Sequence, residues 1–122
     1  MIRLVIPYAD IAPLNRIYAA GHWSTRKKAA DRAHQVVWAA AHEQLGSPIE
    51  PFPEPAEVVI AAFACRPRDV DSYGKLVLDG LVIAGVLADD DYLHVPRLIL
   101  EVHKVARAQE KIVVEILALQ EA

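Results

Sequence analysis

The chain has 122 residues, a hydrophobic fraction of 54% and a formal net charge of −3. This length supports one domain, residues 1–122, and this composition excludes a disordered chain. The lone cysteine, Cys65, excludes an intrachain disulfide framework and is typical of a reducing compartment. The N-terminus lacks a signal-peptide pattern, and no apolar stretch reaches the ~18 residues of a membrane span. We therefore expect a cytoplasmic protein with no membrane partner.

The N-terminal half predicts a strand, a long loop and a long helix. Apolar and other residues alternate over 2–6, which predicts the strand. Residues 7–23 are polar and aromatic, and a loop of this length in a small domain usually has a function. Ser24 or Thr25 is predicted to cap a helix that runs to Leu45, where glycine and proline follow.

The C-terminal half predicts three strands and one helix. The apolar segment Glu57 to Cys65 predicts a buried central strand. Ser72 is predicted to cap a helix over residues 73–84. Residues 97–104 and 111–118 predict two strands, which we expect to pair as an antiparallel hairpin. The predicted fold class is α/β: a single-domain β-α-β-α-β-β sandwich with two helices on a mixed sheet.

Acidic residues are concentrated between positions 69 and 91. This stretch holds six aspartates and one basic residue: Asp69, Asp71, Lys75, Asp79, Asp89, Asp90 and Asp91. Ten acids and twelve bases remain outside it, so the stretch supplies the net negative charge. Gathered carboxylates repel one another unless a cation lies among them, which indicates a divalent metal site. The structural alternative is that the aspartates cap helix N-termini.

The residues around the acids suit phosphodiester hydrolysis. Carboxylates at one point can hold Mg²⁺ by their oxygens and leave positions for water and phosphate. The metal can then activate a water and stabilise developing charge. Lys75 lies four residues after Asp71 and could contact the scissile phosphate. Basic residues flank the acids, and they are Arg66, Arg68 and Arg97.

The acidic motif resembles that of the RusA family of Holliday-junction resolvases. The matching residues are Arg68-Asp69-Val70-Asp71-Ser72-Tyr73-Gly74-Lys75, then Asp79-Gly80-Leu81, Ala84-Gly85-Val86 and Asp89-Asp90-Asp91. The family pattern is R-D-x-D-N-x-x-K, then D-A-L, an A-G-hydrophobic turn and D-D. Pro13-Leu14-Asn15, Trp23 and Lys28 are similar to the family's P-x-x-N opening and basic loop. Two departures stand out: Ser72 replaces the usual asparagine, and this chain is acidic where family members tend to be basic.

The resemblance implies a RusA-like fold and a crossover junction endodeoxyribonuclease. Such an enzyme is a homodimer that uses Mg²⁺, with Mn²⁺ as a substitute, to resolve four-way DNA junctions in recombination and repair. It would belong to a bacterial cell or to its phage or prophage. The implied catalytic residues are Asp69, Asp71, Lys75 and Asp90, and the implied metal ligands are Asp69, Asp71 and Asp90, with Asp89 as an alternative to Asp90. The residues assigned to DNA binding are Asn15, Arg16, Lys27, Lys28, Arg66 and Arg68.

Two further hypotheses stay open at this point. The acidic pI of about 5.9 motivates a non-catalytic DNA-binding accessory protein of the same fold. A nuclease with the same chemistry could instead cut other branched DNA, such as flaps or replication forks. For the dimer, the apolar segments 81–88 and 111–119 are candidate interface material.

Overall fold

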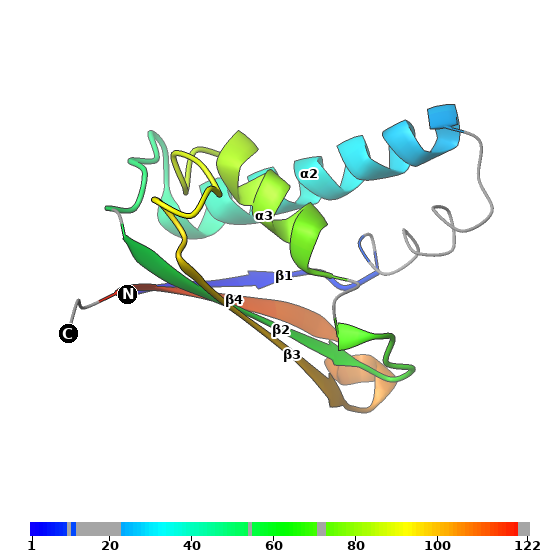
Figure 1. Cartoon of the computed structure of the whole chain (residues 1–122). Coiled ribbons are helices and arrows are strands. Elements are labelled where there is room, and N and C mark those ends of the chain that lie inside the picture. Colours follow the sequence, from blue (N-terminus) through cyan, green and yellow to red (C-terminus); the bar gives the residue numbers. More distant parts are fainter. Residues whose placement is uncertain (10, 12–22, 54, 71–72, 120–122) are drawn as a thin grey trace.

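The computed structural model of the chain describes residues 1–9, 11, 23–53, 55–70 and 73–119 (Figure 1). Within these residues, two helices and a four-stranded mixed sheet confirm the predicted α/β class. The predicted residues Asn15, Arg16, Asp71 and Ser72 lie outside the described residues. In chain order the elements are β1 (Ile2–Ile6), α2 (Trp23–Leu45), β2 (Ala56–Ala64), α3 (Gly74–Ile83), β3 (Arg97–Lys104), the short 3₁₀ turn η2 (Arg107–Gln109) and β4 (Lys111–Ala118).

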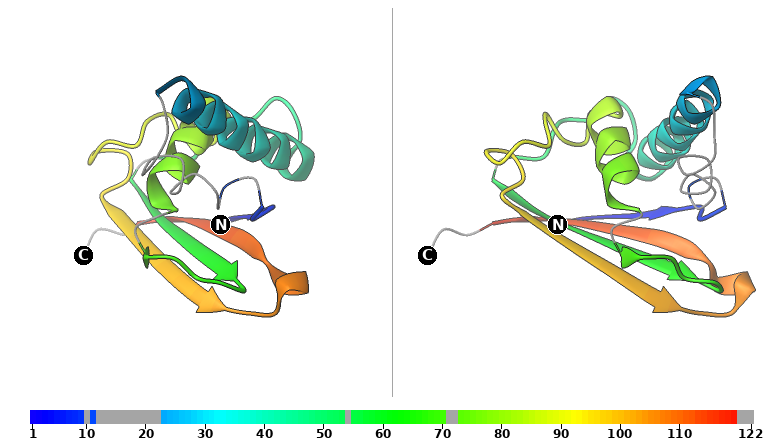
Figure 2. Two further views of the ribbon diagram at one scale, coloured as in Figure 1. Left: turned by 90° about the vertical axis from the view of Figure 1, so that its right-hand side faces the viewer. Right: turned by 45° about the vertical axis from the view of Figure 1, so that its right-hand side comes forward.

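Both helices cover the same face of the sheet, which gives a two-layer molecule (Figure 2). The apolar residues that alternate along β1, β2 and β4 form the inner layer of the core and are almost fully buried: Leu4, Ile6, Val58, Ile60, Ala62, Ile112, Val114 and Ile116. The predicted helix face packs on them, with Ala33, Val37 and Ala41 fully buried. Neither described helix has an apolar stretch long enough to cross a membrane.

The strand order β1-β4-β2-β3 shows that the predicted hairpin is wrong. β3 pairs with β2 in parallel, whereas β4 lies between β1 and β2 and is antiparallel to both. The apolar sequence of β4 suits the centre of the sheet, and the charged residues of β3 suit an edge. Residues 105–110 therefore cross the end of β2, where the Cys65 amide donates to Glu110 Oε2 at 2.9 Å. The prediction of β2 as a central strand is confirmed.

The two helices approach each other closely at one glycine. A Cβ atom at Gly80 would lie 2.8 Å from Val37 Cβ, which is closer than real side chains approach. Glycine, which weakens an isolated helix, is thus the residue that lets α3 pack on α2. This contact fixes the position of α3, and with it the charged residues on its exposed side.

The helix ends differ in how well the sequence predicted them. α2 begins at Trp23, so Ser24 and Thr25 lie inside the helix and the predicted cap is wrong. Gly46 and Gly85 follow the two helices with φ of 83° and 84°. A residue without Cβ adopts this left-handed conformation without strain. The predicted C-terminal ends of both helices are therefore confirmed.

Candidate functional site

A buried tyrosine holds the segment that carries Asp69. Tyr73 is 2% exposed, and its hydroxyl accepts a hydrogen bond from the Arg68 backbone amide at 3.2 Å. The same hydroxyl shares a hydrogen bond with the Tyr8 hydroxyl at 3.0 Å. Burial, followed by the hydrogen bond to Tyr73, raises the pKa of Tyr8 above its ordinary value. Asp69 itself is exposed, at the N-terminal side of α3.

Two of the three consecutive aspartates hold their own turn together. Asp89 Oδ1 accepts the Asp90 amide at 2.7 Å. Asp91 Oδ1 accepts the amides of Leu93 and His94 at 3.1 and 3.0 Å, and the His94 ring Nδ1–H donates to it at 2.6 Å. The hydrogen bond from the His94 side chain is the main cause that lowers the pKa of Asp91. These contacts fix the backbone on both sides of Asp90.

Asp90 is the aspartate of this turn whose carboxylate stays available. Its side chain is exposed and makes no hydrogen bond or ion pair within the described part of the chain. The sequence left Asp89 and Asp90 as alternatives for the third metal ligand. Since Asp89 already accepts a backbone amide, the geometry favours Asp90.

A group of three side chains in the same turn could hold a metal ion. One ligand atom each from Asp89, Asp91 and His94 lies within 4.8 Å of the others, and no other such group of three occurs among the described residues. This set fits Mg²⁺ poorly, because it includes a ring nitrogen and because Asp91 Oδ1 already accepts three hydrogen bonds. The exposed, oxygen-only carboxylate of Asp90 fits Mg²⁺ better.

Asp79 pairs with Lys75 and lines a surface hollow together with Asp90. On the exposed side of α3, Lys75 Nζ lies 3.3 Å from Asp79 Oδ1, one helical turn away. Asp79 and Asp90 both line a surface hollow of about 270 Å³, together with His34 and Ile83. Asp79 thus contacts one predicted catalytic residue, Lys75, and shares a hollow with another, Asp90.

Asp69 lies toward the other end of α3. It precedes the first residue of the helix, whereas the hollow with Asp90 is lined by Val82 and Ile83 of the last turn. A helix of this length spans about 15 Å, and carboxylates that share one ion must lie within a few ångströms of one another. In one protomer, Asp69 therefore lies beside the N-terminal end of α3, and Asp90 lies beside the hollow that Asp79 and the last turn of α3 line.

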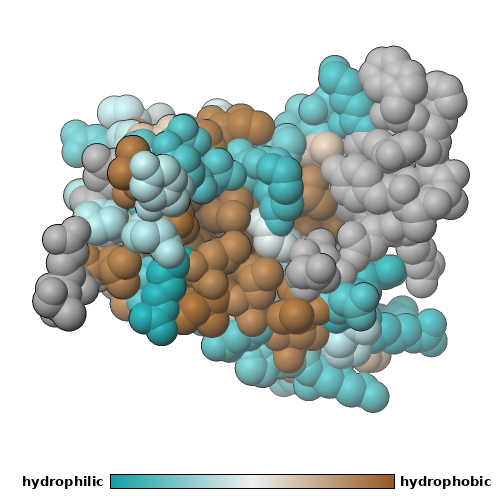
Figure 3. All heavy atoms as spheres, viewed as in Figure 1, coloured by the Kyte–Doolittle hydropathy of each residue, from teal (hydrophilic) through white to brown (hydrophobic). Residues whose placement is uncertain are grey.

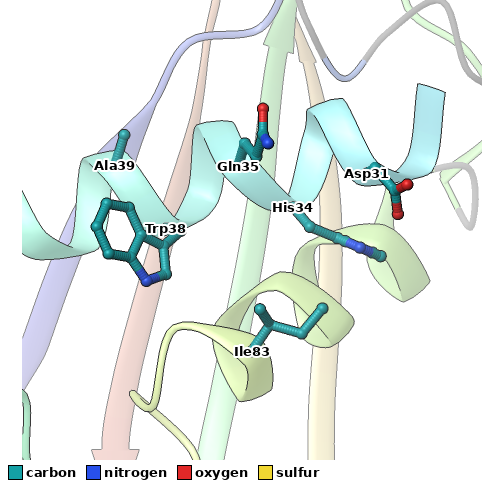
Figure 4. Close-up of a pocket in the computed structure, with 6 residues that line it drawn as sticks. All are labelled: Asp31, His34, Gln35, Trp38, Ala39 and Ile83. Carbon is teal, nitrogen blue, oxygen red and sulfur yellow. The ribbon is translucent and has the colours of Figure 1, made fainter. Parts of the chain in front are cut away.

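A second, larger hollow adjoins the first along the groove between the helices (Figure 4). It has a volume of about 700 Å³ and shares His34 and Ile83 with the smaller hollow. Its lining residues come mainly from α2: Asp31, His34, Gln35, Trp38 and Ala39, with Ile83 opposite. His34 Nε2 is buried with no hydrogen-bond partner among the described atoms. Trp38 is 48% exposed, so this side chain lies at the surface.

His34 and Asp79 are the residues of this region that sequence reasoning missed as site residues. Asp79 follows Lys75 by four positions, and this spacing is the signal that could have linked the two side chains. No local pattern links His34 to Asp90, because helix packing alone brings them together.

The predicted DNA-binding residues that are described lie in two places. Lys27 and Lys28 are exposed near the start of α2, where Lys27 lies 3.8 Å from Asp31. Arg66 is exposed just beyond β2, and Arg68 is partly buried beside Tyr73. The second pair thus lies on the same side of the molecule as Asp69.

Comparisons with known proteins do not identify this chain. No protein-family model matches it, and no curated protein matches it at a significant level.

Proposed function

We propose that this protein is a metal-dependent endodeoxyribonuclease that resolves four-way DNA junctions. The observation that supports this function best is the carboxylate of Asp90, which is exposed and, among the described residues, unpaired in a turn fixed by its neighbours. Lys75, in the first turn of α3, pairs with Asp79, which lines the same hollow as Asp90. The resemblance of residues 68–91 to the RusA motif supplies the reaction class.

In this proposal Mg²⁺, or Mn²⁺ in its place, would supply the activation of water and the stabilisation of negative charge on the phosphate. Asp90, Asp69 and Asp71 would hold the ion by carboxylate oxygens that two protomers contribute. Lys75 binds a phosphate oxygen, which it can reach because its side chain is 83% exposed. Asp79 orients Lys75 through their ion pair. The basic residues near Asp69 and at the start of α2 bind the DNA backbone.

The active form proposed is a homodimer. Junction resolution requires two cuts on opposed strands, which two equivalent sites related by a two-fold axis can supply. The separation of Asp69 from Asp90 also favours two copies. A two-fold axis beside α3 would place Asp90 of one protomer near Asp69 of the other, so that the two acidic groups meet across the interface.

A cleavage assay tests this function directly. The protein would be incubated with a synthetic four-way junction, a flap, a fork and a linear duplex, each with Mg²⁺ and with a chelator. The proposed function predicts paired nicks in the junction that depend on Mg²⁺. Cleavage restricted to flaps or forks would replace the junction with another branched substrate. Junction binding without nicking at any metal concentration would instead identify a non-catalytic accessory protein.

A further inference from the structure

Half of β3 is apolar, yet none of its eight residues is buried. By contrast, β1 is also an edge strand and has only five residues, but two of them are fully buried. Leu98 of β3 is 39% exposed, and Leu100 and Val102 are only partly covered. A strand with this composition and so little burial is a candidate for contact with another chain.

Further exposed hydrophobic residues lie in the segments next to the ends of β2 and β3. Of the large hydrophobic residues exposed in the described chain, Leu98 lies in β3, Tyr92 and Leu93 precede it, and Val70 follows the parallel neighbour β2. Tyr92 is 78% exposed and Leu93 is 57% exposed. Figure 3, viewed with β3 toward the reader, shows brown apolar atoms gathered over the region between α3 and β3.

The backbone of β3 is free to pair along one edge. β3 is the last strand in the order β1-β4-β2-β3, and β2 is the strand with which it pairs in the described sheet. The amides and carbonyls on its other side are a template for a further strand. Leu100 points toward the helices, because a Cβ atom at Gly74 of α3 would lie 3.1 Å from Leu100 Cδ2. Alternation then places Arg97, Ile99 and Glu101 on the opposite face.

The sequence of β3 complements itself in one antiparallel register. With Ile99 at a two-fold axis, Leu98 lies opposite Leu100 of the second copy on the helix side. On the opposite face, Arg97 lies opposite Glu101 of the second copy, and this ion pair occurs twice. If the two-fold axis lay at Leu100, Ile99 would lie opposite Glu101 of the second copy. If the axis lay at Glu101, the two copies of Glu101 would lie opposite each other. Directly opposed like charges destabilise a strand pair, and opposed unlike charges stabilise it.

We propose that the free edge of β3 binds β3 of a second copy of this chain, antiparallel and with Ile99 at the two-fold axis, to form a continuous eight-stranded sheet. The proposal deepens the homodimer of the proposed function and rests on it for its biological meaning. The apolar segments 81–88 and 111–119 do not form this surface. Most of their apolar residues are buried inside the protomer.

The same arrangement accounts for the exposed residues at the ends of β3. An antiparallel pair sets the start of one β3 beside the end of the other. Tyr92 and Leu93, before β3, then approach Val70 of the second copy, which follows the end of β2. The interface would thus cover four exposed hydrophobic residues on each protomer.

Charge reversal tests the register in solution. The self-association constant would be measured by sedimentation equilibrium, without DNA or metal, for the wild type, Glu101→Arg, Arg97→Glu and the double variant. We expect a wild-type dimer, with dissociation constants at least about tenfold higher for each single variant because two opposite-charge pairs become like-charge pairs. The double variant should restore association, although Arg97→Glu also loses its 3.3 Å contact with Glu57. Thermal melts would check that each variant is folded.

Disulfide trapping tests the position of the axis. In a Cys65→Ser background, Ile99→Cys should form a crosslinked dimer under mild oxidation, since the two copies of this residue face each other. Val59→Cys is the matched control, because Val59 is the register partner of Ile99 on β2 and shares its face one strand further from the edge. We expect little crosslinking by this control.

Several results would overturn the proposal. These are a monomer at all concentrations, a dimer unaffected by Glu101→Arg, or trapping through Val59→Cys in preference to Ile99→Cys. The last result would indicate that the uncovered sheet faces stack back to back. These experiments contain neither DNA nor metal. A negative result would therefore contradict the β3 interface without testing the nuclease function.

Discussion

β2 and β3 lie side by side in register, yet they differ in almost every physical respect. Ile60 of β2 is 1% exposed, whereas its register partner Leu100 of β3 is only partly covered. β2 has a strand on each side and helices above it, whereas β3 closes the sheet at an edge. Similar apolar residues therefore support the core in one strand and remain available for binding in the other.

The acids that adjoin the two strands also differ in position. Asp69 follows the C-terminal end of β2, and Asp90 precedes the N-terminal end of β3. Since the strands are parallel, these residues lie toward opposite ends of the same strand pair. The fold thus places one acidic group at each end of its exposed edge, and two copies in antiparallel contact would bring unlike groups together.

The largest expected effect is on stability. Ile60→Ala should lower the free energy of unfolding by about 2–5 kcal/mol, because it leaves a cavity in the covered strand. Leu98→Ala in β3 should lower it by less than about 1 kcal/mol. Urea denaturation would be measured in the Glu101→Arg background, so that self-association does not contribute. Equal losses for both variants would contradict the contrast between the strands.

The next effect concerns two lysines in similar surroundings. Lys75 and Lys27 each form an exposed ion pair with an aspartate one turn later, so neither pair contributes much stability. Lys75→Ala should lower the junction cleavage rate at saturating DNA about 100-fold with an unchanged melting temperature, as expected for a group that stabilises transition-state charge. Lys27→Ala should instead weaken DNA binding at low salt and leave the maximal rate unchanged. If Lys75→Ala and Lys27→Ala lowered the maximal cleavage rate equally, Lys75 would have no catalytic role distinct from that of Lys27.

The smallest expected effect is on the pH dependence of stability. The pKa of Tyr8 is raised in the folded protein, so the unfolded chain loses this proton at lower pH than the folded one. The stabilisation of the folded protein by this raised pKa is complete below pH values near the ordinary tyrosine pKa of about 10. It is lost progressively as the pH rises further. Tyr8→Phe should therefore flatten the alkaline decline of the melting temperature relative to the wild type. An unchanged decline would show that Tyr8 does not cause it.

Local sequence pattern was sufficient for much of the fold, but not for strand order. The apolar run over residues 57–65 predicted the central strand β2, and glycine positions predicted the C-terminal ends of both helices. The hairpin prediction failed because closeness in sequence favours pairing of consecutive strands, whereas burial decides which strand takes the centre. In β4, Ile112, Val114 and Ile116 are fully buried. The charged residues of β3 make that strand unsuitable for this central position.

For the candidate site, the spacing of the motif alone was sufficient to select Lys75 and Asp90. It could not reveal that Asp79, the partner of Lys75, lines the same hollow as Asp90, since this depends on the position of the 88–91 segment beside α3. Nor could it reveal His34, which packing of α2 on α3 brings to the same hollow. The roles of Asp69, Asp71, Lys75 and Asp90 in catalysis stay predictions.

The most direct test of the central claim is junction cleavage by Asp90→Asn in Mg²⁺, with Glu43→Gln as the control. Glu43 is an exposed acid on α2, outside both hollows. We expect Asp90→Asn to bind the junction as the wild type does but to cut it at least about 100-fold more slowly, while Glu43→Gln cuts normally. Undiminished cleavage by Asp90→Asn would contradict the assignment of this carboxylate as a metal ligand.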